Sequence, residues 1–327
     1  MDRQTLADRL LAEGVDWRYP DQEGLSERVL DCRQSSIKEV LRWKGYDKLI
    51  RVFLNRFDCF YSGLLLRRSE PKLMLGWGLT THSSLSPEGV RSMIRSVFSR
   101  IGYCLLYTQA YHMPFSAYYG RYEVLHWSLV IDCDDEQVTL VDDSGSPVYF
   151  QGYVGKVPWE VLADGWRQNA EGGVAYLVRE TVPMESTWPG HCRQLLVDTV
   201  SEMVDRGGLN NLAGFIQAVE AAPLTELIED LERLEFDLNY YRKARELWKL
   251  AVASGHFPAE LTQGTWVEHL SDACQNWSLV MGVAMKWRRQ PSRDYRAKLT
   301  DYLWQAYEAE RACFLAMAEL LQKEGSR

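Results

Sequence analysis

Residues 125–142 of this chain read LHWSLVIDCDDEQVTLVD. Two strand-like runs, Val124 to Ile131 and Gln137 to Val141, flank an acidic turn, and this pattern predicts a β-hairpin. His126 opens the first strand and Asp142 follows the second, so the hairpin would bring the two side chains within hydrogen-bond reach. An imidazole at the start of an apolar strand needs a polar partner. The stretch therefore predicts a histidine that is oriented by a carboxylate.

A second stretch, DCRQSSIKEVLRWKG at residues 31–45, has the pattern of an amphipathic helix. We expect this helix to run from about Cys32 to Lys44 and to stop at Gly45. Cys32 would then lie on the first turn, where unpaired N–H groups and the helix dipole favour a thiolate. The alternative role for Cys32 is that of a small buried apolar residue.

The order of a cysteine at a helix start, then a histidine, then an aspartate across a hairpin is the order of papain-like cysteine enzymes. We therefore expect Cys32 to be the nucleophile, His126 the base and Asp142 the group that orients the base. Asp143 is a rival for the third role. The hairpin can also be purely structural, because Asp-Asp-Ser-Gly at residues 142–145 is an ordinary turn sequence.

The first half of the chain alternates helical and strand patterns. Outside the two quoted stretches, helices are predicted over residues 3–13 and 87–101, the second with Ser86 as its N-cap. Further strands are predicted from Tyr103 to Gln109 and from Val174 to Val178. This half is expected to form a mixed α/β domain.

The second half, from about Gln194 to Gln322, is helical in pattern almost throughout. Its expected breaks are Gly207-Gly208, Pro223, Gly255 to Pro258 and Pro291-Ser292. The change in pattern puts a domain boundary near Pro183 to Gly190. We thus expect an α/β domain over residues 1–188 and an all-helical domain over residues 189–327, the latter acting as a lid, a carrier-protein contact or a homodimer face.

Composition narrows the classes of partner and cofactor. The 327 residues are 46% hydrophobic and carry a formal net charge of −8, so they offer no basic field for nucleic acid.

No apolar run approaches the roughly 18 to 20 residues that span a bilayer, and no secretory leader is evident, so we expect a cytoplasmic protein without a membrane partner. The seven cysteines are an odd number without CxxC spacing, which favours free thiols over disulfides or a zinc site. No metal or cofactor is expected.

A family resemblance joins these features. The stretch at residues 31–45, the segment YTQAYHMPF at residues 107–115 and the stretch from His126 to Asp142 together resemble the butirosin biosynthesis protein H family. In that family a cysteine opens a helix that ends in glycine, an aromatic-rich segment leads to a proline, and a strand opened by histidine is followed by one that ends in aspartate. The likeness also covers the long helical second half.

The resemblance implies an α+β chain whose N-terminal domain has a papain-like fold related to the double-glycine-leader (C39) cysteine peptidases. It also implies an acyltransferase of natural-product biosynthesis, which moves an acyl or aminoacyl group from a carrier protein's phosphopantetheine thioester to a small-molecule amine. Cys32, His126 and Asp142 carry over by position, whereas the substrates do not. Gln109 stands where the family has an aspartate, and the glycine-rich stretch is reduced to GWG at residues 76–78, so the pocket is expected to differ.

Two alternatives use the same residues differently. A cysteine peptidase or amidase would pass the acyl group to water, and a non-catalytic scaffold would simply bury Cys32. No glutamine shortly precedes Cys32, so its own backbone N–H is the expected oxyanion donor. Weaker candidates for substrate contact, each with an ordinary packing role as the alternative, are Gln34, Tyr111, His112, Tyr119 and Trp127.

Overall fold

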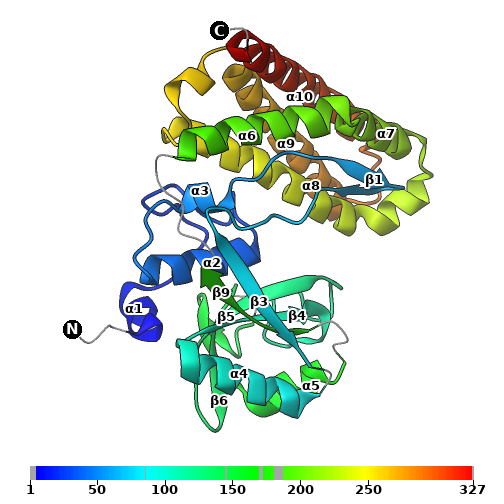
Figure 1. The fold of residues 1–327 in the computed structure, drawn as a ribbon. Coiled ribbons are helices and arrows are strands. Elements are labelled where there is room, and N and C mark those ends of the chain that lie inside the picture. The colour runs from blue at the N-terminus through cyan, green and yellow to red at the C-terminus, as the bar shows by residue number, and fades with distance from the viewer. Residues whose placement is uncertain (1–4, 85, 144–145, 169–171, 180–186, 326–327) are drawn as a thin grey trace. The chain divides into compact units, whose positions relative to one another are not determined.

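The computed structural model describes residues 5–84, 86–143, 146–168, 172–179 and 187–325. Helices and strands are both present, as the sequence predicted (Figure 1). Contacts divide the chain into two units: unit 1 comprises Met1–Val52 and Leu75–Val182, and unit 2 comprises Phe53–Met74 and Pro183–Arg327. Part of the expected boundary, residues 183–186, lies outside the described residues. None of the described helices has the length and apolar character needed to cross a membrane.

In the described part of unit 1, seven strands form one sheet in the order β3-β9-β4-β5-β6-β8-β7, and every neighbouring pair is antiparallel. The strands are β3 Trp77–Ser83, β4 Cys104–Gln109, β5 Leu125–Cys133, β6 Gln137–Val141, β7 Phe150–Gln151, β8 Val154–Pro158 and β9 Gly173–Arg179. The predicted hairpin is confirmed as β5 and β6, with Leu129 paired to Val141. This register sets up the site, because it brings the start of β5 near the end of β6.

The helices of unit 1 are α1 Leu6–Glu13, α2 Cys32–Trp43, α4 Pro87–Ile101 and α5 Trp159–Trp166, with α3 Leu49–Phe53 ending at the unit boundary and a 3₁₀ turn, η1, at Ala110–His112. The predicted start and stop of α4 are confirmed, since the Ser86 hydroxyl accepts the Gly89 N–H and Gly102 adopts the left-handed conformation at φ 82°. Helices α4 and α5 pack together against the sheet (Figure 1). Their shared core includes Val90, Ile94, Leu106, Val130, Leu140 and Leu162.

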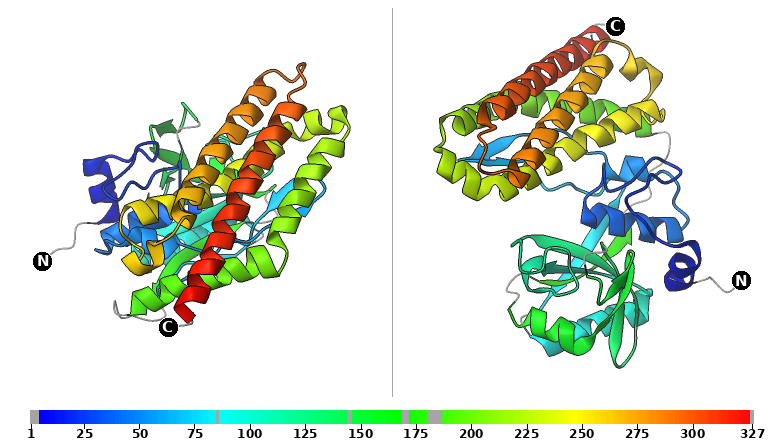
Figure 2. Two further views of the ribbon diagram at one scale, coloured as in Figure 1. Left: turned by 90° about the horizontal axis from the view of Figure 1, so that it is seen from above. Right: turned by 180° about the vertical axis from the view of Figure 1, so that it is seen from behind.

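Unit 2 contains α6 Trp188–Val200, a π turn at Ser201–Asp205, α7 Gly208–Ala221, α8 Leu224–Ala253, a 3₁₀ turn at Ala259–Thr262, α9 Trp266–Arg289 and α10 Arg296–Gly325. Each of the four expected breaks separates two of these helices. Helix α9 packs against α8 and α10, and the three long helices run side by side (Figure 2).

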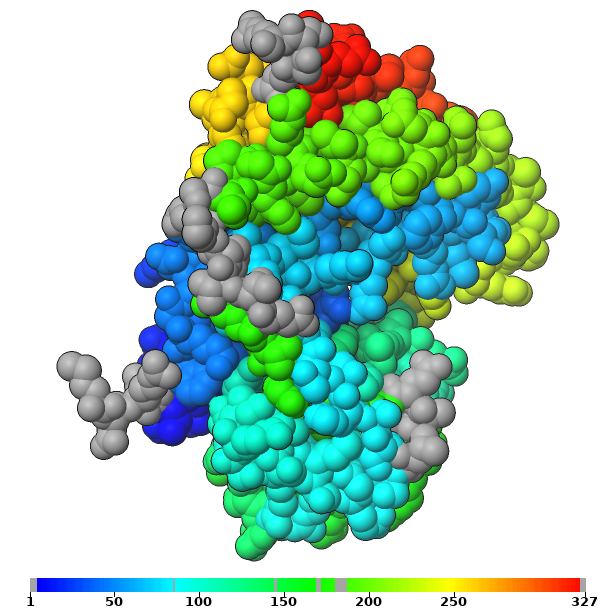
Figure 3. Space-filling model, viewed as in Figure 1, coloured from blue at the N-terminus to red at the C-terminus, as the bar shows by residue number. Residues whose placement is uncertain are grey.

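Unit 2 also contains a short β-hairpin, β1 Phe60–Ser62 and β2 Leu65–Arg67. It belongs to the segment Phe53–Met74, which the sequence analysis had placed with residues 1–188. The hairpin packs against α7 and α8, and in Figure 3 the blue surface of this segment adjoins the green surface of α7. Gly214 permits this contact, since a Cβ there would lie 2.5 Å from the Tyr61 hydroxyl.

Candidate functional site

The start of helix α2 is fixed at Cys32 by a capping box. The Asp31 carboxylate accepts the Gln34 N–H at 2.8 Å, and the Gln34 side-chain carbonyl accepts the Asp31 N–H at 3.1 Å. These bonds satisfy backbone donors that a helix start otherwise leaves unpaired. Gln34, expected among the substrate contacts, is thus a buried part of the cap. Cys32 is the first residue of the helix and is partly exposed.

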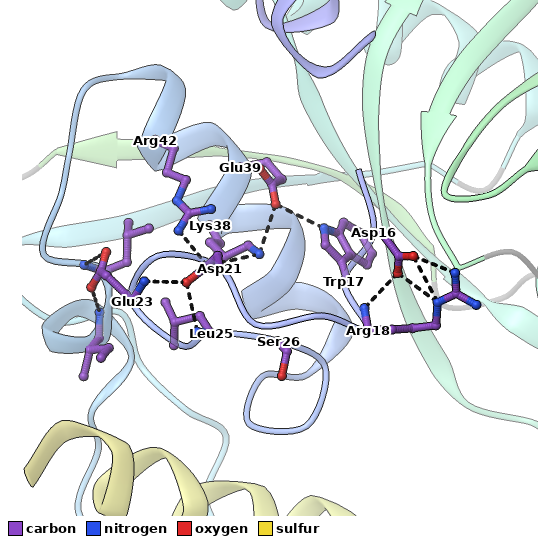
Figure 4. Close-up of polar contacts among 12 residues, drawn as sticks. Asp16, Trp17, Arg18, Asp21, Glu23, Leu25, Ser26, Lys38, Glu39 and Arg42 are labelled. Carbon is purple, nitrogen blue, oxygen red and sulfur yellow. Dashed lines mark hydrogen bonds and ion pairs between the residues drawn. The ribbon is translucent and has the colours of Figure 1, made fainter. Parts of the chain in front are cut away.

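Charged side chains hold the body of α2 (Figure 4): Lys38 and Glu39 are buried, and Asp21 and Arg42 are partly buried. Arg42 Nη2 lies 2.6 Å and Lys38 Nζ 3.4 Å from Asp21 Oδ2. Lys38 Nζ also lies 3.2 Å from Glu39 Oε1, which accepts the Trp17 indole N–H at 3.2 Å. Because Asp21 and Trp17 belong to the loop that precedes α2, these contacts tie α2 to that loop.

The hairpin of β5 and β6 places the His126 imidazole beside the Asp142 carboxylate. His126 Nε2 lies 2.5 Å from Asp142 Oδ1, and the two residues are 3% and 0% exposed. Asp142 Oδ1 also accepts the backbone N–H of Asp143 at 2.7 Å, and Asp142 Oδ2 accepts the Ser128 hydroxyl at 2.5 Å. The carboxylate is therefore hydrogen-bonded at both oxygens and shielded from solvent.

The Cys32 thiol is the third group of the site, and it acts on the His126 imidazole. Burial alone lowers the pKa of His126, but the charge of Asp142, the charge of Cys32 and hydrogen bonds to both side chains oppose it, and the net pKa is raised well above its usual value. Since Nε2 faces Asp142, Nδ1 is the ring nitrogen that takes no part in that bond. The structure thus brings together the three residues expected to carry the chemistry, and the imidazole is favoured in its protonated form.

Asp143, the rival for the third role, lies beside this group. Burial and the neighbouring Asp142 charge raise the pKa of Asp143 to about 6, against the influence of His126 and a hydrogen bond from the Ala117 backbone. Its Oδ1 has no hydrogen-bond partner among the described residues. It is Asp142 whose Oδ1 accepts the hydrogen bond from the imidazole Nε2, which is the contact expected of the orienting residue.

A metal ion is the alternative use of the same cluster. One nitrogen of His126 and one oxygen from each of Asp142 and Asp143 lie within 4.8 Å of one another. The imidazole and the Asp142 carboxylate are, however, already hydrogen-bonded to each other. A metal-binding histidine usually makes such a bond with the nitrogen that the metal leaves free, so Asp142 would orient the imidazole and would not itself bind the metal.

Two residues near the site were not predicted for it. The Tyr118 ring lies 5.2 Å from the His126 ring at 64°, whereas Tyr119, the predicted contact, is 54% exposed. Burial is the main cause of the raised pKa of Tyr118, and Cys32 is among the groups whose charge acts on it. Ser128 was also missed, although it lies two residues after His126, the strand period that puts both side chains on one face.

The contacts that the structure shows for the other weak candidates lie outside the group of Cys32, His126 and Asp142. Tyr111 and His112 stack edge to face in η1, with ring centroids 5.1 Å apart. Trp127 packs against Tyr107 at 4.8 Å, and the Arg33 guanidinium lies 5.9 Å from the centre of the Trp127 ring. The Trp127 indole therefore packs against the side chain of Arg33, the second residue of α2.

Two pockets in the described part of unit 1 lie away from Cys32, His126 and Asp142. One of about 180 Å³ lies between α4 and α5, and one of about 560 Å³ adjoins the C-terminal end of α2. Charged residues that line the larger pocket are paired within the protein: Arg9 with Glu13 at 3.1 Å and Arg42 with Asp21 at 2.6 Å. Neither pocket is lined by the thiol, the imidazole or the Asp142 carboxylate.

The arrangement suits covalent acyl chemistry. A partly exposed thiol faces a buried base, and the base is oriented by a carboxylate that donors hold at both oxygens. These are the parts of an activated nucleophile. No family model matches this chain, and a comparison with curated proteins finds no match either.

Proposed function

We propose that this chain is a cysteine-dependent acyltransferase that moves an acyl or aminoacyl group from a carrier-protein thioester, through an acyl-Cys32 intermediate, to a small-molecule amine. The observation that carries the proposal is the chain of contacts from Cys32 to His126 to Asp142. Cys32 is the first residue of α2 and lies beside the buried imidazole of His126.

In the first half-reaction, the Cys32 thiolate attacks the thioester carbonyl of the donor. The carbonyl oxygen becomes an oxyanion, for which the backbone N–H of Cys32 at the helix start is the proposed donor. The carbon–sulfur bond to pantetheine then breaks, and the leaving thiolate takes the proton of the His126 imidazolium. The products are acyl-Cys32, a free pantetheine thiol and neutral His126.

In the second half-reaction, the acceptor amine attacks the acyl-Cys32 carbonyl. His126 takes a proton from the attacking nitrogen, the bond to Cys32 breaks, and the amide product leaves. This step restores the thiolate and the imidazolium. Asp142 holds the imidazole in the tautomer that both steps require.

The proposal includes a papain-like, C39 peptidase-like fold for the α/β part and membership of a group like the butirosin biosynthesis protein H family. It is supported by a cysteine at the start of α2, a histidine at the start of β5 and an aspartate directly after β6. The helices after residue 188 are proposed to contact the carrier protein, to act as a lid or to form a dimer face. A cytoplasmic role in natural-product biosynthesis completes the proposal.

Hydrolysis is the second candidate, because the same three side chains would serve a peptidase or amidase with water as the acceptor. A scaffold with an inert cysteine is less well supported, since Cys32 is partly exposed and contacts a buried base.

The deciding experiment incubates the full chain with an acyl-pantetheine thioester and follows its intact mass. We expect the wild type to gain one acyl group and Cys32→Ala to gain none. Adding a panel of primary amines should then discharge the acyl-enzyme with formation of amides. Discharge at a rate independent of the amine, with the free acid as product, would identify a hydrolase. Acylation of Cys32→Ala at the wild-type rate would overturn the proposal.

A further inference from the structure

The Asp142 carboxylate has a donor that the proposed mechanism does not use. Its Oδ1 faces His126 and the Asp143 backbone N–H, and its Oδ2 accepts the hydroxyl of Ser128 at 2.5 Å. Ser128 and Asp142 are both 0% exposed. Water therefore has no access to replace this hydrogen bond.

The sheet explains why this serine reaches the carboxylate. Ser128 follows His126 by two residues on β5, so the two side chains project from the same face of the strand. Leu129 pairs with Val141 across the hairpin, which puts Ser128 opposite Asp142. One strand thus presents an imidazole to one carboxylate oxygen and a hydroxyl to the other.

We propose that Ser128 is a positioning residue of the candidate site: its hydroxyl holds the Asp142 carboxylate against His126 and thereby keeps the imidazole in place beside Cys32. A carboxylate oxygen left unpaired away from water is costly, whereas a hydrogen bond from a hydroxyl satisfies it. The charge of Asp142 is one of the causes that raise the pKa of His126. The inference rests on the proposed function, because it takes Cys32 as the nucleophile.

A neighbouring hydroxyl provides a matched control. Thr108 pairs directly with His126 from β4 and is 1% exposed. Unlike the hydroxyl of Ser128, its Oγ1 has no hydrogen-bond partner among the described residues. Removing the Thr108 hydroxyl therefore shows the effect of losing a buried hydroxyl close to the imidazole that makes no hydrogen bond to the Asp142 carboxylate.

The titratable groups that act on His126 and its surroundings come from several elements. They are Cys32 from α2, Tyr118 from the loop after η1, and Asp142 and Asp143 from the segment after β6. Ser128 itself does not titrate in this range. A change in the pH profile on removing its hydroxyl therefore reports on these groups.

The experiment measures the rate of Cys32 alkylation by iodoacetamide against pH, using peptide mapping of the full chain. In Ser128→Ala the pH midpoint of Cys32 alkylation should rise by about one unit, with about a tenfold slower reaction below the midpoint. Thr108→Val should keep the wild-type midpoint. An unchanged midpoint in folded Ser128→Ala, or an equal shift in Thr108→Val, would overturn the inference.

A second variant covers a failure of Ser128→Ala to fold. Ser128→Cys keeps nearly the same volume but offers a weaker hydrogen-bond donor. The pH midpoint of Cys32 alkylation in this variant should therefore lie between the wild-type midpoint and the midpoint expected when the hydrogen bond to Asp142 is absent. A wild-type midpoint in Ser128→Cys would contradict the role of Ser128. The proposed function fails separately, if Cys32 of the wild type is no more reactive than Cys133.

Discussion

His126 Nε2 lies 2.5 Å from Asp142 Oδ1, and their side chains are 4% and 0% exposed. An ion pair removed from water depends on each partner, because removing one charge leaves the other without compensation. Here the imidazole also faces the thiol of Cys32. The effect of a substitution at one residue should therefore be visible as a change in the chemistry of another.

The first prediction ranks the three residues by the rate of acyl-enzyme formation. Cys32→Ala should abolish it, because the nucleophile is gone. His126→Ala should slow it by about 10² to 10⁴, and Asp142→Asn should cost less, since it disturbs the tautomer and alignment of a base that is still present. Intact mass against time measures all three rates.

Asp143→Asn is the control for this series. Its carboxylate is not the one that bonds the imidazole, so acyl-enzyme formation should stay near the wild-type rate. A complete loss in Asp143→Asn together with an unaffected Asp142→Asn would move the third role one residue along the chain.

The second prediction is that Cys32 is the thiol most readily alkylated in the folded chain. Five other cysteines, Cys59, Cys104, Cys192, Cys274 and Cys313, are buried. Cys133 is partly exposed, but burial and the charge of Asp132 raise its pKa. Peptide mapping after limiting iodoacetamide should therefore find the label on Cys32, and preferential labelling of Cys133 would contradict the assignment.

The local sequence pattern was sufficient to predict the site residues that lie on helices and strands. The alternation in β5 and β6 predicted the hairpin, and the hairpin predicted the bond between His126 and Asp142. The same period of two also points to Ser128, so that residue was within reach of the sequence. Tyr118 was not, because no periodic pattern distinguishes it from Tyr119 in an irregular loop.

Several of the strands that the sequence analysis missed pair or pack with elements far away in the chain. Strand β3, Trp77–Ser83, is partly polar, and its strand partner is β9, Gly173–Arg179, almost a hundred residues later. The strands of the hairpin in Phe53–Met74 are three residues long, and they pack on α7 and α8 of the distant second half. Nothing local in either segment indicates the element that it will contact.

The third prediction concerns pH and stability at Asp143. The native state holds the Asp143 proton more tightly than the unfolded chain does, because its pKa is raised from 3.8 to about 6. Wild-type stability therefore falls as the pH rises between about 4 and about 6, by at most about 3 kcal/mol. Asp143→Asn cannot ionise, so it should be more stable than the wild type at about pH 7.5 and nearly equal to it at about pH 4.

Urea unfolding of both proteins at the two pH values tests this, with a fluorescence or circular dichroism signal assigned to unit 1. The sign follows from the raised pKa: protonation favours the native state, and ionisation at higher pH opposes it. A stability gap of the same size at both pH values would show that the effect of Asp143→Asn is steric and would contradict the prediction.

The last prediction compares two aspartates of the loop that precedes α2 (Figure 4). Asp21→Asn keeps an oxygen able to accept the Glu23 and Leu25 backbone N–H groups, which now bond Oδ1 at 2.8 and 2.9 Å. It removes the charge that faces Lys38, whose side chain is 4% exposed, and Arg42. Breaking such an enclosed pair should cost about 3 kcal/mol of unfolding free energy.

Asp16→Asn is the matched control, because Asp16 pairs with Arg18 through a bidentate contact whose arginine side chain is 56% exposed. Solvent screens that pair, so the loss should stay below about 1 kcal/mol. Asp21→Asn should also slow Cys32 acylation, since the charge it removes holds α2 to its loop, while Asp16→Asn should leave the rate unchanged. Equal losses of stability in the two variants, or wild-type acylation by Asp21→Asn despite the lower stability, would show that the charge of Asp21 does not position α2.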